Sequence, residues 1–259
     1  MRILLTNDDG IKSPGLFLLA DALRSGGHRV FVVAPDTERS GMSHSVTFFA
    51  NPCKLRPLGE DTWSCSGTPA DCVVVALNGG LPQLSLAGGA PPDLVLSGIN
   101  RGANLGTDVV YSGTAAAARQ GSLMGIPSVA LSLVEWAAGA ASGTGSEWHW
   151  EPAVAFTMKK LEEMVGYWQK GTFVNVNFPN TQAGAADLVQ ASLCKRHYTD
   201  AIEPFTAPGG DIYCFARIGK SLCKDEEAAP AVLNDGEQVR GGNASLSVIL
   251  SQPVAVFGV

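Results

Sequence analysis

Apolar runs and amphipathic stretches alternate along the first half of the chain. Residues 2–6 are a short apolar run, Pro14 begins a helical stretch that reaches about Ser25, and residues 30–34 are a second apolar run. Runs without alternating polar residues are typical of strands that are covered on both faces, and therefore of a parallel sheet. The pattern predicts a βαβ unit at the start of the chain.

The same order of elements continues to about residue 180. We expect helices at 71–78, 114–124 and 152–168, and strands at 93–96, 127–133 and 172–177. Residues 71–78 include a β-branched run, but we interpret them as a helix because the strand at 93–96 needs a crossover element before it. The predicted fold is a doubly wound α/β protein with a mostly parallel, Rossmann-like sheet.

The last third of the chain is less regular. Short strands are expected near residues 188–193, 211–216 and 245–250, separated by turns rich in proline and glycine. We predict one domain over residues 1–259, with an α/β core to about 180 and an antiparallel extension over 181–259. The Gly/Ser/Ala-rich insert at 137–147 is interpreted as a mobile loop. Trp136, Trp148 and Trp150 flank it, and core anchoring is favoured over stacking on a base.

Composition excludes several classes of partner. The net charge is −6, with 18 Lys and Arg and no basic run, which argues against duplex nucleic acid. No stretch of about 20 apolar residues is present, so we expect no membrane span. The chain start does not resemble a secretory signal, and we expect a cytoplasmic protein, with an organelle left open. The six cysteines form no C-x-x-C pair and are expected to be reduced and mostly buried.

Polar residues follow three of the predicted strands. Asp8 and Asp9 follow the first strand, the loop after the second contains Ser40, and Asn100 comes soon after the strand at 93–96. In doubly wound sheets these strand ends share one ligand-binding edge. An isolated Asp-Asp-Gly is most often a solvated turn, but two adjacent carboxylates near further oxygen ligands favour a cation. This oxygen set predicts one divalent ion per subunit, Mg²⁺ or Mn²⁺, with Ca²⁺ as an alternative.

A turn with two hydroxyl side chains precedes the Ala-rich helix at 114–124. Ser112, Gly113 and Thr114 there are consistent with a simple helix cap, which is the more frequent use of such residues. They are also consistent with an anion site at the positive end of the helix. A second Gly/Ser-rich turn at Ser40–Ser43 lies on the same predicted edge. A metal site between two such turns suggests a phosphate ester as ligand.

A series of motifs resembles a known family. The motifs, in chain order, are Leu4–Gly10 with Pro14 and Gly15, Ala34–Asp36 with Arg39–Gly41, Ser66–Cys72, Asp93–Asn100 with Gly102 and Asn104–Gly106, Tyr111–Thr114, and Asn175–Pro179. In order and approximate spacing they are similar to the SurE family of survival-protein nucleotidases. The similarity covers roughly the first 133 residues, returns at 175–179, and is loose after about 190.

The resemblance implies a metal-dependent phosphatase that hydrolyses nucleoside monophosphates, as a 5′- or 3′-nucleotidase. The implied metal ligands are Asp8, Asp9, Ser40 and Asn100, the same four that follow from the strand ends. The implied phosphate and substrate contacts are Asn104, Ser112, Gly113 and Thr114, with Ser43 as a weaker candidate. The family also implies a homodimer or homotetramer that exchanges C-terminal segments.

A mechanism follows as a hypothesis. The metal activates a water, Asp8 acts as general base or orients that water, and Asp9 with Ser40 and Asn100 mainly fixes the ion. Asp8 and Asp9 are thus the candidate catalytic residues. A covalent aspartyl-phosphate at Asp8 stays open, as does a non-catalytic metal- or nucleotide-binding protein on the same fold. His44 and His197 are interpreted as structural or solvated.

Overall fold

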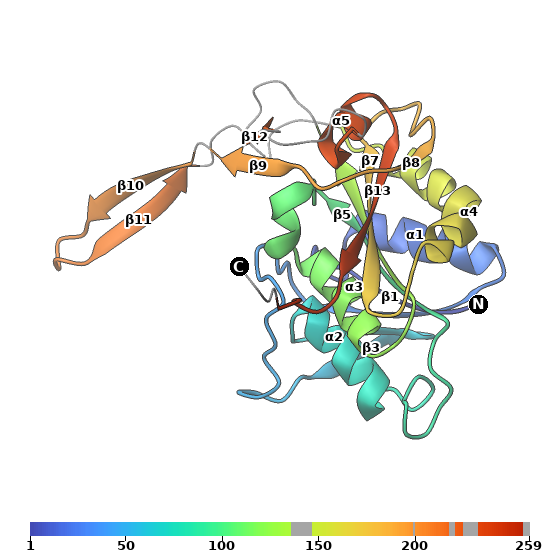
Figure 1. Ribbon diagram of the computed structural model, residues 1–259. Helices are drawn as coiled ribbons and strands as arrows, with labels where there is room; N and C mark the ends of the chain where they lie inside the picture. Colours follow the sequence, from blue (N-terminus) through green and yellow to red (C-terminus); the bar gives the residue numbers. More distant parts are fainter. Residues whose placement is uncertain (136–146, 199, 218–220, 225–232, 256–259) are drawn as a thin grey trace.

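A nine-stranded sheet forms the centre of the molecule (Figure 1). The computed structural model describes residues 1–135, 147–198, 200–217, 221–224 and 233–255. The strand order in the sheet is β3-β4-β2-β1-β5-β6-β7-β13-β8. These strands are β1 (Arg2–Thr6), β2 (Arg29–Pro35), β3 (Leu55–Gly59), β4 (Thr62–Cys65), β5 (Leu94–Arg101), β6 (Ser128–Val134), β7 (Thr172–Pro179), β8 (Leu188–Gln190) and β13 (Ala244–Leu250).

The inner strands are parallel, as predicted. β1 lies between β2 and β5, and the parallel series continues from β2 to β4 and from β5 through β6 to β7. Antiparallel pairing is found between β3 and β4 and between β7 and β13. The chain therefore winds outward from β1 in both directions, and the carboxyl ends of β1, β2 and β5 meet at one edge.

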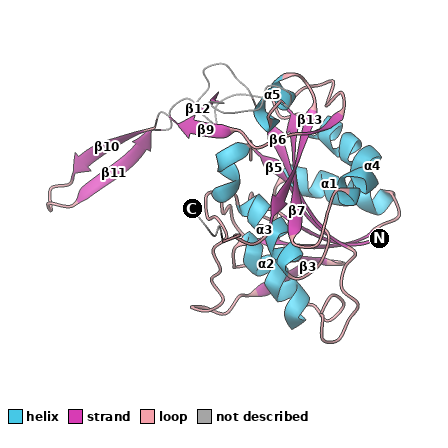
Figure 2. Ribbon diagram, in the orientation of Figure 1, coloured by secondary structure: helices cyan, strands magenta, loops and turns pink. Residues whose placement is uncertain are grey.

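Helices cover both faces of the sheet (Figure 2). Ile3 and Leu5 pack in the cluster that contains the residues of α1 and α4, whereas Leu4 packs in the cluster of α2. Successive residues of a strand point to opposite faces of the sheet. All three side chains are fully buried, because helices cover both of these faces. The helical elements are α1 (Pro14–Ser25), α2 (Pro69–Val75), η1 (Ala76–Gly80), η2 (Gly106–Val110), α3 (Gly113–Leu123), α4 (Trp150–Gly166) and α5 (Asp235–Arg240).

The helix predicted at 71–78 is present but begins earlier. Thr68 caps α2 with a reciprocal pair of hydrogen bonds: its side chain accepts from the Asp71 N–H, and the Asp71 carboxylate accepts from the Thr68 N–H. Pro69 follows the cap in the first helical turn, where a missing N–H costs nothing. The β-branched residues are tolerated because the helix packs against the sheet, and a π-helical turn, η1, follows it.

The C-terminal region contributes to two different parts of the molecule. β13 pairs antiparallel with β7, and β8 pairs parallel with β13, so both strands belong to the core sheet. Two antiparallel pairs lie outside it, β9 (Lys195–Tyr198) with β12 (Ser221–Lys224) and β10 (Ala201–Thr206) with β11 (Ile212–Arg217). The β10–β11 hairpin projects from the body (Figure 1). The antiparallel extension therefore consists of β9–β12, and the core sheet reaches beyond residue 180.

Trp148 and Trp150 anchor the chain after the insert. Their rings stack with centroids 5.6 Å apart, and Trp150 is 8% exposed in the core cluster of α1 and α4. A side chain at Gly15 would lie 2.7 Å from the Trp150 ring, so this approach requires glycine. The prediction of core anchoring is confirmed for these two residues, while Trp136 and the insert lie outside the described residues.

Two further expectations can be compared with the described residues. None of their helices has the length and apolar character needed to cross a membrane. Cys65, Cys72 and Cys194 are buried free thiols, Cys53 is half-buried, and Cys214 on β11 is exposed. Three of these five thiols are buried, which confirms that they are mostly buried, and their reduced state stays a prediction.

Candidate active site

Asp8 lies between the end of β1 and the N-terminus of α3. The Thr114 N–H donates to Asp8 Oδ2 at 3.1 Å, and the Thr114 hydroxyl donates to Asp8 Oδ1 at 2.5 Å. The side chain of Asp8 is almost completely buried, so desolvation raises its pKa, while the hydrogen bonds from Thr114 act in the opposite direction. One N–H group of the helix N-terminus thus binds a carboxylate of the protein, and phosphate binding at this helix end stays a prediction.

Gly113 is required by this close approach. A Cβ at this position would lie 2.8 Å from Asp8 Cβ and 3.0 Å from Asp8 Oδ2. Both distances are shorter than ordinary contacts between carbon or oxygen atoms. Any side chain here would push the helix away from Asp8. Gly113 therefore shapes the site, whether or not its N–H group also contacts a substrate.

Asp9 is a half-buried carboxylate with an unfavourable charge. Its Oδ2 accepts a hydrogen bond from the Arg101 N–H in β5, at 3.0 Å. Burial, the neighbouring charge of Asp8 and the charge of Glu38 raise the pKa of Asp9 to about 7, against the lowering effect of Arg101. None of the ion pairs among the described residues includes Asp8 or Asp9. Two adjacent acids in this state are stabilised by a bound cation.

The loop after β2 brings Ser40 close to the two acids, and Asn100 lies in the last residues of β5, which reaches Arg101 and is therefore longer than the strand expected at 93–96. The Arg39 N–H donates to the Asp8 carbonyl at 2.7 Å, which places Ser40 one residue away. Asn100 directly precedes Arg101, whose N–H is bonded to Asp9. The Ser40 hydroxyl is exposed and donates to Glu38 at 2.9 Å, whereas the Asn100 amide donates to the Gly102 carbonyl at 3.0 Å.

The four predicted ligands form a set that suits a hard divalent cation. Two carboxylates, one hydroxyl and one amide oxygen are all oxygen donors, which Mg²⁺ and Mn²⁺ prefer. No group of three His, Cys, Asp or Glu side chains that could hold a metal occurs in the described ranges. A metal at this edge would therefore depend on Ser40, Asn100 and solvent as well as on the acids. The residues fit the ion that the sequence predicted, and its presence stays a prediction.

The predicted phosphate contacts have identifiable partners within the protein. The Ser112 side chain accepts from the Ala115 N–H at 3.0 Å, so it caps α3. The Ser43 hydroxyl donates to the Val110 carbonyl at 2.7 Å and its N–H donates to the Tyr111 carbonyl at 3.0 Å. Ser43 thus ties the Ser40 loop to the turn before α3. A direct contact of these residues with phosphate stays a prediction.

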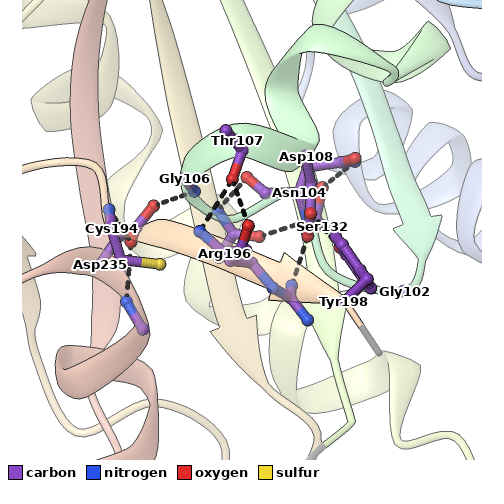
Figure 3. Close-up of polar contacts among 12 residues, drawn as sticks. Gly102, Asn104, Gly106, Thr107, Asp108, Ser132, Cys194, Arg196, Tyr198 and Asp235 are labelled. Atoms are coloured by element: carbon purple, nitrogen blue, oxygen red, sulfur yellow. Dashed lines mark hydrogen bonds and ion pairs between the residues drawn. The ribbon is translucent and has the colours of Figure 1, made fainter. Parts of the chain in front are cut away.

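Asn104 belongs to a buried polar network. Its side-chain amide donates to the Ser132 hydroxyl at 2.8 Å (Figure 3). Its N–H donates to Asn177 Oδ1 at 2.9 Å. Asn175 and Asn177 both donate to its carbonyl. The sequence contains a signal for Asn175 and Asn177, because residues two apart on a strand point to the same face of the sheet. Asn104 is held in a fixed position, and its contact with substrate is untested.

Asp108, in η2 before α3, connects this turn to β9 (Figure 3). Its carboxylate accepts from the Arg196 guanidinium and the Tyr198 hydroxyl, both on β9. Its carbonyl accepts from the Ser112 N–H at 3.1 Å. The Asp108 and Arg196 side chains are only 11% and 9% exposed. The sequence reasoning missed this ion pair, because its members are 88 residues apart in the chain.

The remaining candidates have smaller roles. His44 Nε2 lies 2.9 Å from Gln120 Oε1 on α3, and burial lowers the pKa of His44. This contact favours the structural interpretation of His44. The side chain of His197 is outside the described part of the chain. Arg101, which sequence reasoning did not select, is an exposed cation beside Asp9 with its guanidinium carbon 5.2 Å from the Trp148 ring centroid.

The fold and the site define a class: a doubly wound α/β protein with a buried carboxylate pair where the first strand ends against a helix N-terminus. The family model described as survival protein SurE matches residues 3–200. The chain therefore belongs to the SurE family, as its motifs indicated.

Relatives extend over most of the chain. A protein named 5′-nucleotidase SurE from Synechococcus sp. (strain JA-3-3Ab) is 43% identical over 224 residues, which are 82% of this chain and 79% of the relative. One of the same name from Xanthomonas campestris pv. campestris (strain B100) is 36% identical over 96% of this chain and 89% of its own length. The crystal structure of the SurE protein from Aquifex aeolicus superposes with a TM-score of 0.76 at 32% identity, covering 98% and 95% of the two chains.

Proposed function

We propose that this chain is a divalent-metal-dependent 5′-nucleotidase that hydrolyses a nucleoside monophosphate to the nucleoside and phosphate. One observation carries the proposal: the Asp8–Asp9 pair is held by N–H groups of α3 and β5 and has no ion-pair partner among the described side chains. The name 5′-nucleotidase borne by relatives over most of the chain supports the substrate class.

The chain's own residues have distinct parts in this reaction. A bound Mg²⁺ or Mn²⁺, held by Asp8, Asp9, Ser40 and Asn100, would supply Lewis-acid chemistry and make a water more acidic. Asp8 is fixed by its two hydrogen bonds from Thr114, so its carboxylate can direct a water or take up its proton in one orientation. The hydroxyl proton of Ser112 is not used in capping α3 and would be donated to a phosphate oxygen.

Phosphate release from a panel of nucleotides tests the proposal. The panel contains 5′- and 3′-nucleoside monophosphates, each assayed with EDTA, Mg²⁺ or Mn²⁺. We expect activity with a metal, none with EDTA, and a preference for the 5′-phosphate. Asp8→Asn should remove turnover while the thermal unfolding transition persists. Substantial turnover by Asp8→Asn would refute the role of Asp8, and turnover in EDTA would refute metal dependence.

A non-catalytic metal- or nucleotide-binding protein is the second candidate. It is favoured if no nucleotide is hydrolysed with any metal although nucleotide binding is measurable. The complete set of two acids, one serine and one asparagine supports the enzyme instead, because a chain that had lost catalysis would not need both carboxylates.

We also infer that the chain forms a homodimer or homotetramer through its C-terminal region. The β10–β11 hairpin supports this inference, because five of its large apolar side chains are each more than half exposed: Ile202, Phe205, Ile212, Tyr213 and Phe215. Light scattering of the protein and of a variant with Phe205→Ser and Phe215→Ser tests it. An unchanged molar mass in the variant would contradict the role of the hairpin.

A further inference from the structure

Arg119, on α3, is a half-buried cation without an acidic partner among the described residues. None of their ion pairs includes it. Its guanidinium carbon lies 5.2 Å from the centroid of the Phe173 ring. Burial lowers the pKa of Arg119, and no described carboxylate compensates. An arginine stays protonated in proteins, so the charge persists and is expected to be paired with an anion.

A cavity opens beside this guanidinium. Its volume is about 600 Å³, within the usual range of small-molecule sites. Arg119 and His44 contribute charge and hydrogen-bonding groups to its lining, and Gln252 adds an amide. Leu123 and Leu250 contribute apolar surface. The combination of one desolvated cation with apolar walls suits a small organic anion rather than a metal ion or an uncharged ligand.

The cavity is distinct from the candidate active site. Thr114, in the first turn of α3, contacts Asp8, and Arg119 follows five residues later. Five residues of α-helix advance about 7.5 Å along the axis and turn about 140° around it. The two side chains therefore leave the helix in different directions. The Ser40 loop connects the two places, since His44, on the same loop, contacts Gln120.

We propose that Arg119 is the centre of a second anion site, which binds the phosphate group of a small organic phosphate with the organic part against Leu123 and Leu250. A guanidinium presents two parallel N–H donors that match two phosphate oxygens. Inorganic phosphate and a nucleoside monophosphate share this chemistry and are the two sources to be distinguished. The proposal does not depend on the proposed nucleotidase function.

Calorimetric titration of the metal-free protein tests the site. The protein is kept in EDTA, which prevents metal-dependent binding at Asp8 and Asp9, and is titrated with inorganic phosphate and, separately, with adenosine 5′-monophosphate. We expect one binding event per chain with the nucleotide, weakened tenfold or more in Arg119→Met, because a charge-assisted contact is lost. Arg101→Met is the matched control, because Arg101 is the exposed arginine beside Asp9. This variant should bind the nucleotide as tightly as the wild type does.

The possible results separate the proposal from its alternatives. Arg119→Lys keeps the positive charge but lacks the two parallel N–H donors of the guanidinium. It should bind the nucleotide more weakly than the wild type and more tightly than Arg119→Met. Tighter binding of the nucleotide than of phosphate supports a contribution from the apolar walls, and equal binding places the affinity at Arg119 alone; both support the site. Absence of binding in EDTA, or a loss in Arg101→Met instead of Arg119→Met, would overturn it. So would a change in molar mass of Arg119→Met by light scattering, which would identify the face as an interface between copies.

Discussion

Replacing Asp9 by asparagine should stabilise the metal-free protein at high pH. Burial, together with the charges of Asp8 and Glu38, raises the pKa of Asp9 to about 7. Asparagine has nearly the same shape, and its Oδ1 can still accept the hydrogen bond that Asp9 receives from the Arg101 N–H at 3.0 Å. The substitution therefore removes an unfavourable charge and keeps the contact that positions the side chain.

The effect has a definite sign and pH window. The pKa of Asp9 is higher in the folded chain than in the unfolded one, so between pH 4 and 7 the folded state holds a proton that the unfolded state has released. The stability of the wild type then falls as the pH rises through this window. A pKa of about 7 in place of 3.8 corresponds to at most about 4 kcal/mol. Solvent reaches part of Asp9, so we expect a gain of about 1–2 kcal/mol for Asp9→Asn, or roughly 2–6 °C in Tm.

Thermal unfolding in EDTA at pH 4.5 and pH 8 measures the difference. We expect Asp9→Asn to exceed the wild type in Tm at pH 8 and to exceed it by much less at pH 4.5, where Asp9 is protonated in the folded chain and most of the window has not yet been crossed. Adding Mg²⁺ or Mn²⁺ at pH 8 should raise the Tm of the wild type and leave that of Asp9→Asn nearly unchanged. An equal Tm of the two proteins at pH 8 in EDTA would show that Asp9 carries no electrostatic strain, and the argument for a cation from this pair would fail.

Two further substitutions test the contacts around the site. Asp108→Asn breaks the buried ion pair with Arg196 and should lower the free energy of unfolding by about 3 kcal/mol, measured by urea denaturation. Glu203→Gln removes an exposed ion pair of the hairpin and should lower it by less than about 1 kcal/mol. Equal losses in the two variants would contradict a special role of Asp108. Thr114→Val removes the hydroxyl that donates to Asp8, so it should lower the free energy of unfolding by about 1–3 kcal/mol and weaken Mn²⁺ binding, measured by calorimetry. Thr114→Ser keeps the hydroxyl and should retain most of the stability and of the Mn²⁺ affinity. Similar Mn²⁺ affinities of the two variants would exclude the hydroxyl as the cause.

The core of the fold could be predicted because its signals are local. The apolar runs at β1 and β2 and the proline at the start of α1 lie within 35 residues, and period and propensity are sufficient there. The place of β13 could not be predicted in this way. It pairs with β7 across about 70 residues of chain, and its short apolar run is equally compatible with a separate extension. Only long-range pairing, which periodicity does not contain, assigns it to the core sheet.

The candidate site shows the same limit at the level of single contacts. Placing Asp8 at a strand end and Ser112 to Thr114 at a helix N-terminus required only the sequence, but the direct hydrogen bonds between Thr114 and Asp8 required the structure. This contact changes the assignment of the helix N-terminus. The positive end of α3 stabilises a carboxylate of the protein, so one of its N–H groups is already used before any substrate arrives. Under the proposed function, a phosphate at this edge would then depend on the cation and the Ser112 hydroxyl more than on the helix, and weaker metal binding would weaken substrate binding with it.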